Sequence, residues 1–247
     1  MKRKHIIILG SIIIVLISTI ACLYFLNRKA NDYSEHMGNQ NDYPLQGKTI
    51  IFLGSSITYG EAADGRSFVD IMEEKDGINA IKEAVSGTTL ADTGNESYIQ
   101  RMEDNIDKSV QADAFVCQLS TNDALQRIPL GTVADTKDIG TFDINTIIGA
   151  IEYIIGYASE TWECPIVFYT NPQFGHKGYG EMVEALDVIQ KKWDIGIVDM
   201  YRDEDFNNIS EEKKKEYMAD WIHPTEAGYV EWWTPFFEEY LIEYLNL

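Results

Sequence analysis

Residues 49–58 read TIIFLGSSIT, and this stretch decides the fold that the sequence predicts. The run at 49–53 is apolar and rich in strand-forming residues, which is typical of a buried strand. Gly54 lets the chain turn sharply, so that a serine after the turn can present its hydroxyl at the edge of a sheet. We therefore interpret residues 49–58 as the first strand of an α/β domain and the turn that follows it.

The same alternation continues along the chain. Apolar runs typical of strands recur at 78–85, 114–119, 165–170 and 195–200. Helical periodicity occupies 67–74, 97–107, 143–159, 179–193 and 225–245. Apolar strands separated by helices predict a five-stranded parallel sheet covered by helices on both faces. In such sheets, sites form beyond the carboxyl ends of the strands.

The first 29 residues are predicted to be a membrane anchor. Residues 6–26 form a 21-residue stretch without charge, long enough at ~1.5 Å per residue to cross a ~30 Å hydrocarbon layer. Three basic residues precede this stretch and two follow it, which favours a cytoplasmic N-terminus. We expect a transmembrane helix of a single-pass protein of the cell membrane, then a polar linker at 30–46 and an extracytoplasmic domain at 47–247.

A lipoprotein signal is the alternative interpretation of the N-terminus, with Cys22 as the lipidated residue after Ala21. Thr19 and Ile20 fit the cleavage context poorly, and apolar residues continue past Cys22, so the uncleaved anchor is favoured. Either interpretation tethers the domain to the membrane and places it outside the cytoplasm.

The globular part is strongly acidic. The whole chain has 20 basic and 40 acidic residues, and five of the basic ones flank the apolar run, which leaves 15 against 40, or −25, from residue 30 onward. Such a surface repels polyphosphate, so we expect no nucleic-acid partner, and it disfavours extended contact with anionic headgroups. A neutral or cationic substrate fits better, although acidic residues also serve simply to keep a domain soluble.

Ser56 is the candidate nucleophile, because it follows the turn after the first strand. A hydroxyl is a weak nucleophile until a base removes its proton. The same residues could instead form a turn that caps the next helix. A phosphate-binding loop is excluded because the GxxxxGK[ST] and GxGxxG spacings are missing.

Asp220 and His223 are the candidate pair that handles the proton. An Asp three residues before a His can fold back and accept a hydrogen bond from Nδ1, which leaves Nε2 to act as the base. Packing or capping at the start of a helix is the competing role for His223. His176, in the loop after the fourth strand, is the rival base, but it has no nearby Asp.

Gly87 and Asn122 follow the second and third strands. The backbone N–H of Gly87, the side-chain amide of Asn122 and the N–H of Ser56 would form an oxyanion hole, the largest catalytic contribution expected here. Each is an ordinary loop residue when taken alone. Their placement after successive strands makes the set informative.

The order and spacing of these four segments resemble the SGNH hydrolase superfamily, the GDSL-type esterases and lipases, over nearly all of residues 48–245. The first block, GSS at 54–56, matches the nucleophile block, with Ser55 where the family has Asp. The second, VSG at 85–87, matches the block that supplies the oxyanion glycine. Four such blocks in the expected order form a specific signal.

The third block, STND at 120–123, matches the block that supplies the oxyanion asparagine, with Ser120 where the family usually has Gly. The last, DWIH at 220–223, matches the D-x-x-H block. The resemblance implies a flavodoxin-like three-layer α/β/α sandwich that hydrolyses esters through an acyl-serine intermediate. It implies no metal and no organic cofactor.

Several functions remain open from the sequence. The ester substrate is expected to be an acylated, above all acetylated, glycan or another small acyl ester. The alternatives are a lysophospholipase or short-chain lipase, an acyltransferase, and a non-catalytic cell-surface binding domain. The binding domain is disfavoured because no catalytic residue is missing. The sequence carries no signal for an oligomeric state.

Three further features are less specific. Arg101 could reach the site or pair with a surface acid. Asp203, Asp205 and Asn207 resemble part of a calcium loop, which is excluded because the required Gly and Glu are absent. The aromatic residues of the last helix are expected to pack against the sheet, with an acyl or sugar platform as the alternative; they are Trp232, Trp233, Phe236, Phe237, Tyr240 and Tyr244.

Overall fold

A five-stranded parallel sheet lies at the centre of the computed structural model, which describes residues 43–94 and 96–247. The strands follow the order β2-β1-β3-β4-β5. Their bounds are β1 Thr49–Gly54, β2 Asn79–Ala84, β3 Ala114–Gln118, β4 Ile166–Tyr169 and β5 Gly196–Val198. The predicted five-stranded parallel sheet is therefore confirmed, with strand ends that differ by at most two residues from the predicted ones.

The register of β1 explains where a site can form. Thr49 to Gly54 pair with Asn79 to Ala84 of β2, and Ile50 to Leu53 pair with Ala114 to Cys117 of β3. Because all strands are parallel, their carboxyl ends meet at one edge of the sheet. The order 2-1-3-4-5 is flavodoxin-like, and its topological switch point lies between β1 and β3, where ligands bind in such folds.

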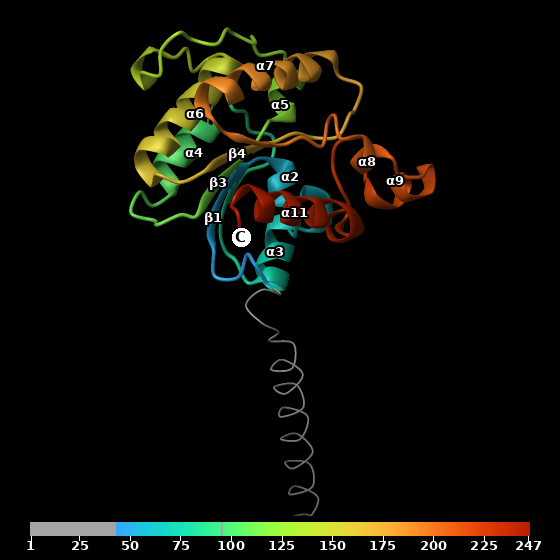
Figure 1. Cartoon of the computed structure of the whole chain (residues 1–247). Coiled ribbons are helices and arrows are strands. Elements are labelled where there is room, and N and C mark those ends of the chain that lie inside the picture. Colours follow the sequence, from blue (N-terminus) through green and yellow to red (C-terminus); the bar gives the residue numbers. More distant parts are fainter. Residues whose placement is uncertain (1–42, 95) are drawn as a thin grey trace, which may run out of the picture. The chain divides into compact units, whose positions relative to one another are not determined.

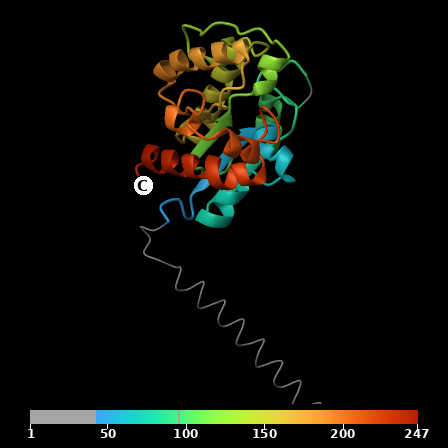
Figure 2. The same ribbon diagram turned by 90° about the vertical axis from the view of Figure 1, so that its right-hand side faces the viewer.

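Helices cover both faces of this sheet, which confirms the predicted three-layer sandwich (Figure 1). One face carries α4 Tyr98–Asn105, α6 Ile147–Trp162 and α7 Lys177–Trp193. The other carries α3 Phe68–Asp76 and α11 Thr234–Tyr244. Figure 2 shows α11, in red, on the near side of the domain.

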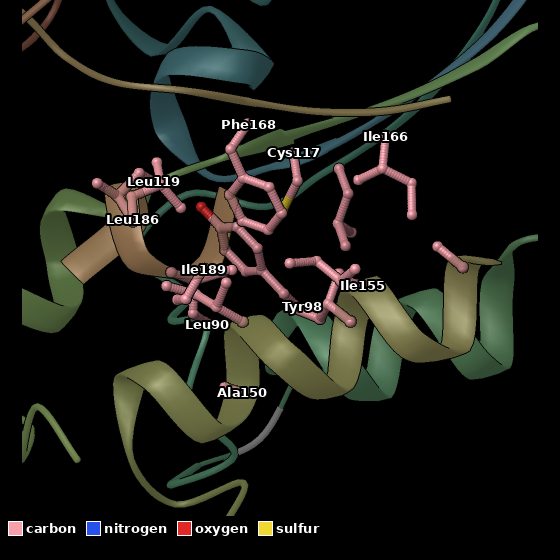
Figure 3. Close-up of a cluster of buried hydrophobic side chains, with 14 of the residues drawn as sticks. Leu90, Tyr98, Cys117, Leu119, Ala150, Ile155, Ile166, Phe168, Leu186 and Ile189 are labelled. Atoms are coloured by element: carbon pink, nitrogen blue, oxygen red, sulfur yellow. The ribbon is translucent and has the colours of Figure 1, made fainter. Parts of the chain in front are cut away.

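Each face of the sheet has its own apolar core. On the α6 side, side chains such as Ile151, Ile154 and Ile155 follow helical spacing and are fully buried. Figure 3 shows this core, with Phe168 of β4 and Cys117 of β3 above Ile155 of α6. Alternate residues of every central strand point into one core or the other, which explains why these strands are continuously apolar.

The core on the α11 side is aromatic. Phe68 of α3 stacks on Phe237 of α11 with ring centroids 4.0 Å apart, and Trp233 is fully buried beside them. Trp232, Phe236, Tyr240 and Tyr244 are partly buried against the same core. The expectation that these aromatic residues pack against the sheet is confirmed.

The C-terminal segment is helical as predicted, but it is not one regular α-helix. It consists of α10 Glu226–Gly228, a π-helical turn η4 Tyr229–Trp233, and α11. The N–H of Thr234 bonds to the carbonyl of Tyr229, five residues back. Pro235 lacks an N–H and would clash with the carbonyl four residues before it, so a wider turn at this point relieves the conflict.

The remaining helices are short. They are α2 Ser56–Tyr59, η2 Glu61–Ala63, α5 Thr121–Leu125, η3 Ile139–Thr141, α8 Glu204–Asn207 and α9 Glu211–Tyr217. The sequence did not predict α8 and α9. Asp203 and Ser210 cap them by accepting hydrogen bonds from backbone N–H groups. Asp203, once compared with a calcium ligand, is therefore a helix cap.

The predicted anchor at 1–29 and the first 13 residues of the predicted linker at 30–46 lie outside the described residues. In the part that is described, no helix is both long and apolar enough to cross a membrane.

Candidate active site

The turn after β1 holds Ser56 at the start of α2, at the carboxyl edge of the sheet. Gln118, the last residue of β3, fixes this turn, because its Oε1 accepts hydrogen bonds from the Ser55 N–H (2.8 Å) and from Thr58 Oγ1 (2.9 Å). Gly54 is required here: a Cβ at that position would lie 1.7 Å from Thr58 Oγ1. The nucleophile candidate is thus held by a rigid, buried turn.

The structure brings Ser56, His223 and Asp220 together, although Ser56 and His223 are 167 residues apart in the chain. Ser56 Oγ lies 2.8 Å from His223 Nε2. His223 Nδ1 lies 2.8 Å from Asp220 Oδ2. The other carboxylate oxygen, Oδ1, accepts hydrogen bonds from the N–H groups of Ile222 (2.7 Å) and His223 (2.8 Å).

These contacts determine which nitrogen of His223 carries a proton. Partial burial acts to raise the pKa of Asp220, but the hydrogen bonds from the His223 ring and from the His223 and Ile222 N–H groups outweigh it and lower this pKa below its usual value. An ionised carboxylate only accepts hydrogen bonds, so Nδ1 must be the donor. In the neutral imidazole, Nε2 is then free to accept the Ser56 proton.

His176, the rival base, lies elsewhere. Its ring stacks on Phe174 at 6.1 Å, and its Nδ1 is buried without a partner in the described part of the chain. The structure pairs Ser56 with His223 instead.

Gly87 and Asn122 lie on neighbouring loops of the same edge. Gly87 has a φ of +80°, a conformation that favours glycine, and a Cβ there would meet nothing within 4 Å. The Nδ2 of Asn122 donates to the carbonyl of Thr88, the residue after Gly87, at 2.9 Å. This bond orients the amide with its second N–H still available for an oxyanion.

Arg101 reaches the back of the site, which settles the choice that the sequence left open. Its Nη2 donates to the carbonyl of Gly54 (2.8 Å) and to Thr88 Oγ1 (3.0 Å), and its Nη1 to Glu83 (2.9 Å). The side chain is 3% exposed. One buried guanidinium therefore joins the end of β1, the end of β2 and the Gly87 loop.

Asp123 is a second supporting residue that the sequence analysis did not assign. Its fully buried carboxylate accepts hydrogen bonds from the N–H groups of Leu90 (2.8 Å) and Ala91 (3.0 Å). Burial raises its pKa, and these bonds oppose that effect. The signal was present in the sequence, since Asp123 is part of the STND block.

Within residues 43–94 and 96–247, no group of three or more His, Cys, Asp or Glu side chains is arranged to hold a metal ion. That the chemistry needs no metal and no organic cofactor stays a prediction.

The sequence model of the GDSL-like lipase/acylhydrolase family matches residues 52–230, which is more than half of the chain. This range contains Ser56, Gly87, Asn122, Asp220 and His223. No curated protein sequence matches the chain.

Solved structures share the fold at low sequence identity. A Lactobacillus plantarum protein superposes with a TM-score of 0.64 at 18% identity, over 81% of this chain and 97% of its own. A member of the lipolytic protein G-D-S-L family from Veillonella parvula gives 0.54 at 20%, over 80% and 97%. A family two carbohydrate esterase from Clostridium thermocellum, solved in complex with cellohexaose, gives 0.58 at 16%, over 81% and 65%.

Proposed function

The chain belongs to the GDSL-like lipase/acylhydrolase family, and on this premise we propose that Ser56, His223 and Asp220 hydrolyse acyl esters of carbohydrates outside the cytoplasm. The chain is an SGNH-type serine esterase. The observation that carries the assignment of residues is the pair of 2.8 Å contacts that links the Ser56 hydroxyl through the His223 ring to the Asp220 carboxylate.

The first half of the reaction forms the acyl-enzyme. His223 Nε2 takes the proton of Ser56 as Oγ bonds to the ester carbonyl carbon, and the carbonyl electrons move to its oxygen. The N–H groups of Ser56 and Gly87 and the free N–H of Asn122 Nδ2 stabilise this oxyanion. When the carbonyl re-forms, the alcohol leaves with the proton from His223.

The second half regenerates the enzyme. Water attacks the acyl-serine while His223 takes one of its protons, and the oxyanion forms again in the same place. Collapse of this intermediate releases the carboxylic acid and returns the proton to Ser56 Oγ. Asp220 stabilises the charged imidazole in both halves and keeps Nε2 facing the serine.

Ser56→Ala tests this assignment. We expect the turnover of p-nitrophenyl acetate to fall by about 10⁴–10⁶-fold, because no other group can form the acyl intermediate. A fluorophosphonate probe should label the wild-type chain and not the variant. Ser109→Ala, at an exposed loop position, is the matched control and should be labelled like the wild type. Full activity of Ser56→Ala would reject the assignment.

Carbohydrate esters are the substrates we favour. An acidic surface suits neutral polymers better than anionic lipid, and a structural neighbour is a carbohydrate esterase. A lysophospholipase or short-chain lipase and an acyltransferase would use the same residues. Acetylated glycans assayed beside p-nitrophenyl esters of graded chain length separate these activities, and exclusive turnover of long chains would exclude the carbohydrate assignment.

The proposed location rests on the sequence. The uncharged stretch at 6–26, with more positive charge before it than after it, supports an N-terminal anchor that places the enzyme outside the cytoplasm. Protease added to intact cells, or to spheroplasts where an outer membrane intervenes, would then digest the domain. Full protection of the domain in that assay would contradict this location.

A further inference from the structure

A cavity of about 50 Å³ lies beside the Asp220 carboxylate, on the loop that carries the catalytic pair. Its wall includes Asp220 and Trp221, the loop after β4 at Asn171, and side chains of α8 and α9. At roughly 10–15 Å³ per water, it has room for about four water molecules. The cavity therefore has room for part of a ligand, and its wall also includes apolar side chains, those of Pro172, Ile209, Met218 and Trp232.

Three amide side chains make this cavity rich in hydrogen-bond acceptors. Asn171 Nδ2 donates to the Ile222 carbonyl (3.3 Å), Gln173 Nε2 to the Tyr201 carbonyl (3.2 Å) and Asn207 Nδ2 to the Met200 carbonyl (2.8 Å). Backbone carbonyls thus engage the NH₂ group of each amide. The amide oxygens receive no hydrogen bond from the described residues.

The three amide oxygens differ in how far a ligand can reach them. Asn171 is 2% exposed and its Oδ1 is shielded from solvent. Gln173 and Asn207 are exposed. A ligand hydroxyl in the cavity would therefore find its acceptors at the amide oxygens of Gln173 and Asn207.

Trp221 adds an aromatic surface at the same cavity. Its side chain is 58% exposed, which is unusual for an indole. The ring of Phe174 packs edge-on against it at 5.7 Å, and Phe174 packs on the buried Tyr179 at 4.9 Å. The exposed indole therefore rests against a ring that contacts the core and offers an apolar surface beside the cavity.

The amide oxygens and the exposed indole together distinguish between the alcohol half and the acyl half of an ester substrate. An alkyl chain would cover the amides of Gln173 and Asn207 and the charged groups of Asp220 and Lys214 without bonding to them, which is unfavourable. A sugar ring has hydroxyl donors on its edges for the amide oxygens and C–H groups on its face for the indole. Lys214 can donate to a ring or hydroxyl oxygen.

From these contacts we infer that the cavity is a subsite for the sugar moiety of the substrate, with Trp221 as the stacking platform and the oxygens of Gln173 and Asn207 as acceptors for sugar hydroxyls. The subsite rests on the proposed function, because the ester must reach Ser56 while its sugar occupies the cavity. It assigns the alcohol half of the ester, rather than the acyl half, to the Asp220 side of the site.

The experiment compares Trp221→Ala and Gln173→Met with the wild type. For each, kcat/KM is measured with p-nitrophenyl acetate and with acetylated glucose, xylose, cello-oligosaccharide and chito-oligosaccharide. We expect the ratio of sugar-ester to p-nitrophenyl-ester kcat/KM to fall about tenfold, mainly through KM, which corresponds to about 1.4 kcal/mol. Gln173→Met keeps the side-chain length and lies outside the 220–223 loop, so it remains informative if Trp221→Ala disturbs His223.

Val188→Ala is the control, because Val188 is 53% exposed on α7, and its ratio should equal that of the wild type. Equal losses on both substrate types in Trp221→Ala and Gln173→Met would overturn the subsite while leaving the esterase intact. A selective loss of p-nitrophenyl octanoate turnover would assign the cavity to the acyl chain and would also overturn the sugar subsite. The subsite would likewise be overturned if the wild type hydrolysed p-nitrophenyl acetate but none of the sugar esters. A wild type that hydrolyses no ester and resists fluorophosphonate would instead reject the proposed function.

Discussion

Asp220 has more hydrogen-bond partners than its position on an open loop would suggest. Its side chain is 46% exposed, yet both of its carboxylate oxygens are engaged, one by two backbone N–H groups and the other by the His223 ring. All three partners are donors. The site therefore requires at this position a group that only accepts hydrogen bonds, which is the property of an ionised carboxylate.

Asp220→Asn should for this reason inactivate the enzyme without unfolding it. If the amide NH₂ faces His223, Nδ1 must become the acceptor and Nε2 keeps the proton, so it cannot deprotonate Ser56. If the amide is turned round, its NH₂ faces the backbone N–H groups of Ile222 and His223, so that donors face donors and these hydrogen bonds are lost. We expect kcat for p-nitrophenyl acetate to fall about 10²–10⁴-fold, towards the lower end because water reaches the carboxylate.

The control for that experiment is Asp194→Asn, which makes the same chemical change at an exposed residue. Asp194 ends α7 with φ +59°, a conformation that Asn adopts well. Its kcat should match that of the wild type. If Asp220→Asn kept kcat within about threefold of the wild type, Asp220 would have no role in fixing the tautomer.

The residues that we propose to act on the substrate were identified from short blocks in the sequence. The residues that hold these side chains in place were found only from the structure. Ser56, Asn122 and His223 lie in short blocks whose order is informative on its own. Gln118 and Thr88 act through contacts made 63 and 34 residues away in the chain, with Ser55 and Asn122 respectively. A polar Gln in an apolar strand was a signal, but it does not reveal its partner.

At the level of elements, the sheet and the long helices followed from their patterns because one dominant force, burial of a periodic apolar face, determines each of them. The short α8 and α9 have few apolar residues, and capping by Asp203 and Ser210 stabilises them instead. The π turn before Pro235 relieves the conflict between the proline and the carbonyl four residues before it, and helical periodicity does not reveal it. Local propensity alone does not determine such features.

Helices α3 and α11 bring together two carboxyl groups, Asp76 and Glu238, that no motif in the sequence pairs. Burial, together with the nearby Glu238 carboxylate, raises the pKa of Asp76 to about 7. Lys75 binds Glu238 through a 2.7 Å ion pair. Asp76 Oδ2 is buried without a partner among the residues that the structure describes. In the folded domain, Asp76 is thus favoured in its protonated form below about pH 7.

The contribution of Asp76 to the stability of the domain should therefore decrease as pH rises from about 4 to about 7. In this interval the unfolded chain loses the Asp76 proton while the folded domain keeps it, so the unfolded state is favoured by increasing pH. Asp76→Asn removes the titration. We expect its melting temperature to exceed that of the wild type by more at pH 8 than at pH 5, measured by calorimetry at constant ionic strength.

Loss of one negative charge from an acidic chain could itself stabilise the domain. Asp194→Asn removes the same charge from an exposed position, so its effect is subtracted from that of Asp76→Asn at each pH. After this subtraction, the difference in melting temperature between Asp76→Asn and the wild type could stay constant between pH 5 and pH 8. That result would show that Asp76 is not protonated in the folded domain at neutral pH.

On the scale of the whole molecule, the sheet brings distant parts of the chain to one edge. Ser56 follows β1 and His223 follows β5 and two short helices, yet their side chains touch. That meeting could be expected from the sequence because the carboxyl ends of parallel strands share one edge. The cavity beside Asp220 could not, since α8, α9 and the loop after β4 form it jointly.

The N-terminal limit of the folded unit is a property of the whole core. Leu45 is 1% exposed and packs into the aromatic core on the α11 side, and the Lys48 N–H bonds to its carbonyl. The predicted domain starts at residue 47 and would omit this side chain. Burial of a leucine is worth about 1.5–3 kcal/mol, so two fragments that differ only in residues 43–46 should differ in stability.

We expect fragment 47–247 to melt about 3–12 °C below fragment 43–247, since 1 kcal/mol shifts the melting temperature of a domain of this size by roughly 2–4 °C. Both should hydrolyse p-nitrophenyl acetate at the same rate at 25 °C, because Leu45 lies in the core between α3 and the sheet rather than at the carboxyl edge. Leu45→Ala in fragment 43–247 separates the side chain from chain length and should reproduce most of the loss. Equal melting temperatures for the two fragments would mean that the core does not depend on Leu45 and that a boundary at residue 47 is sufficient.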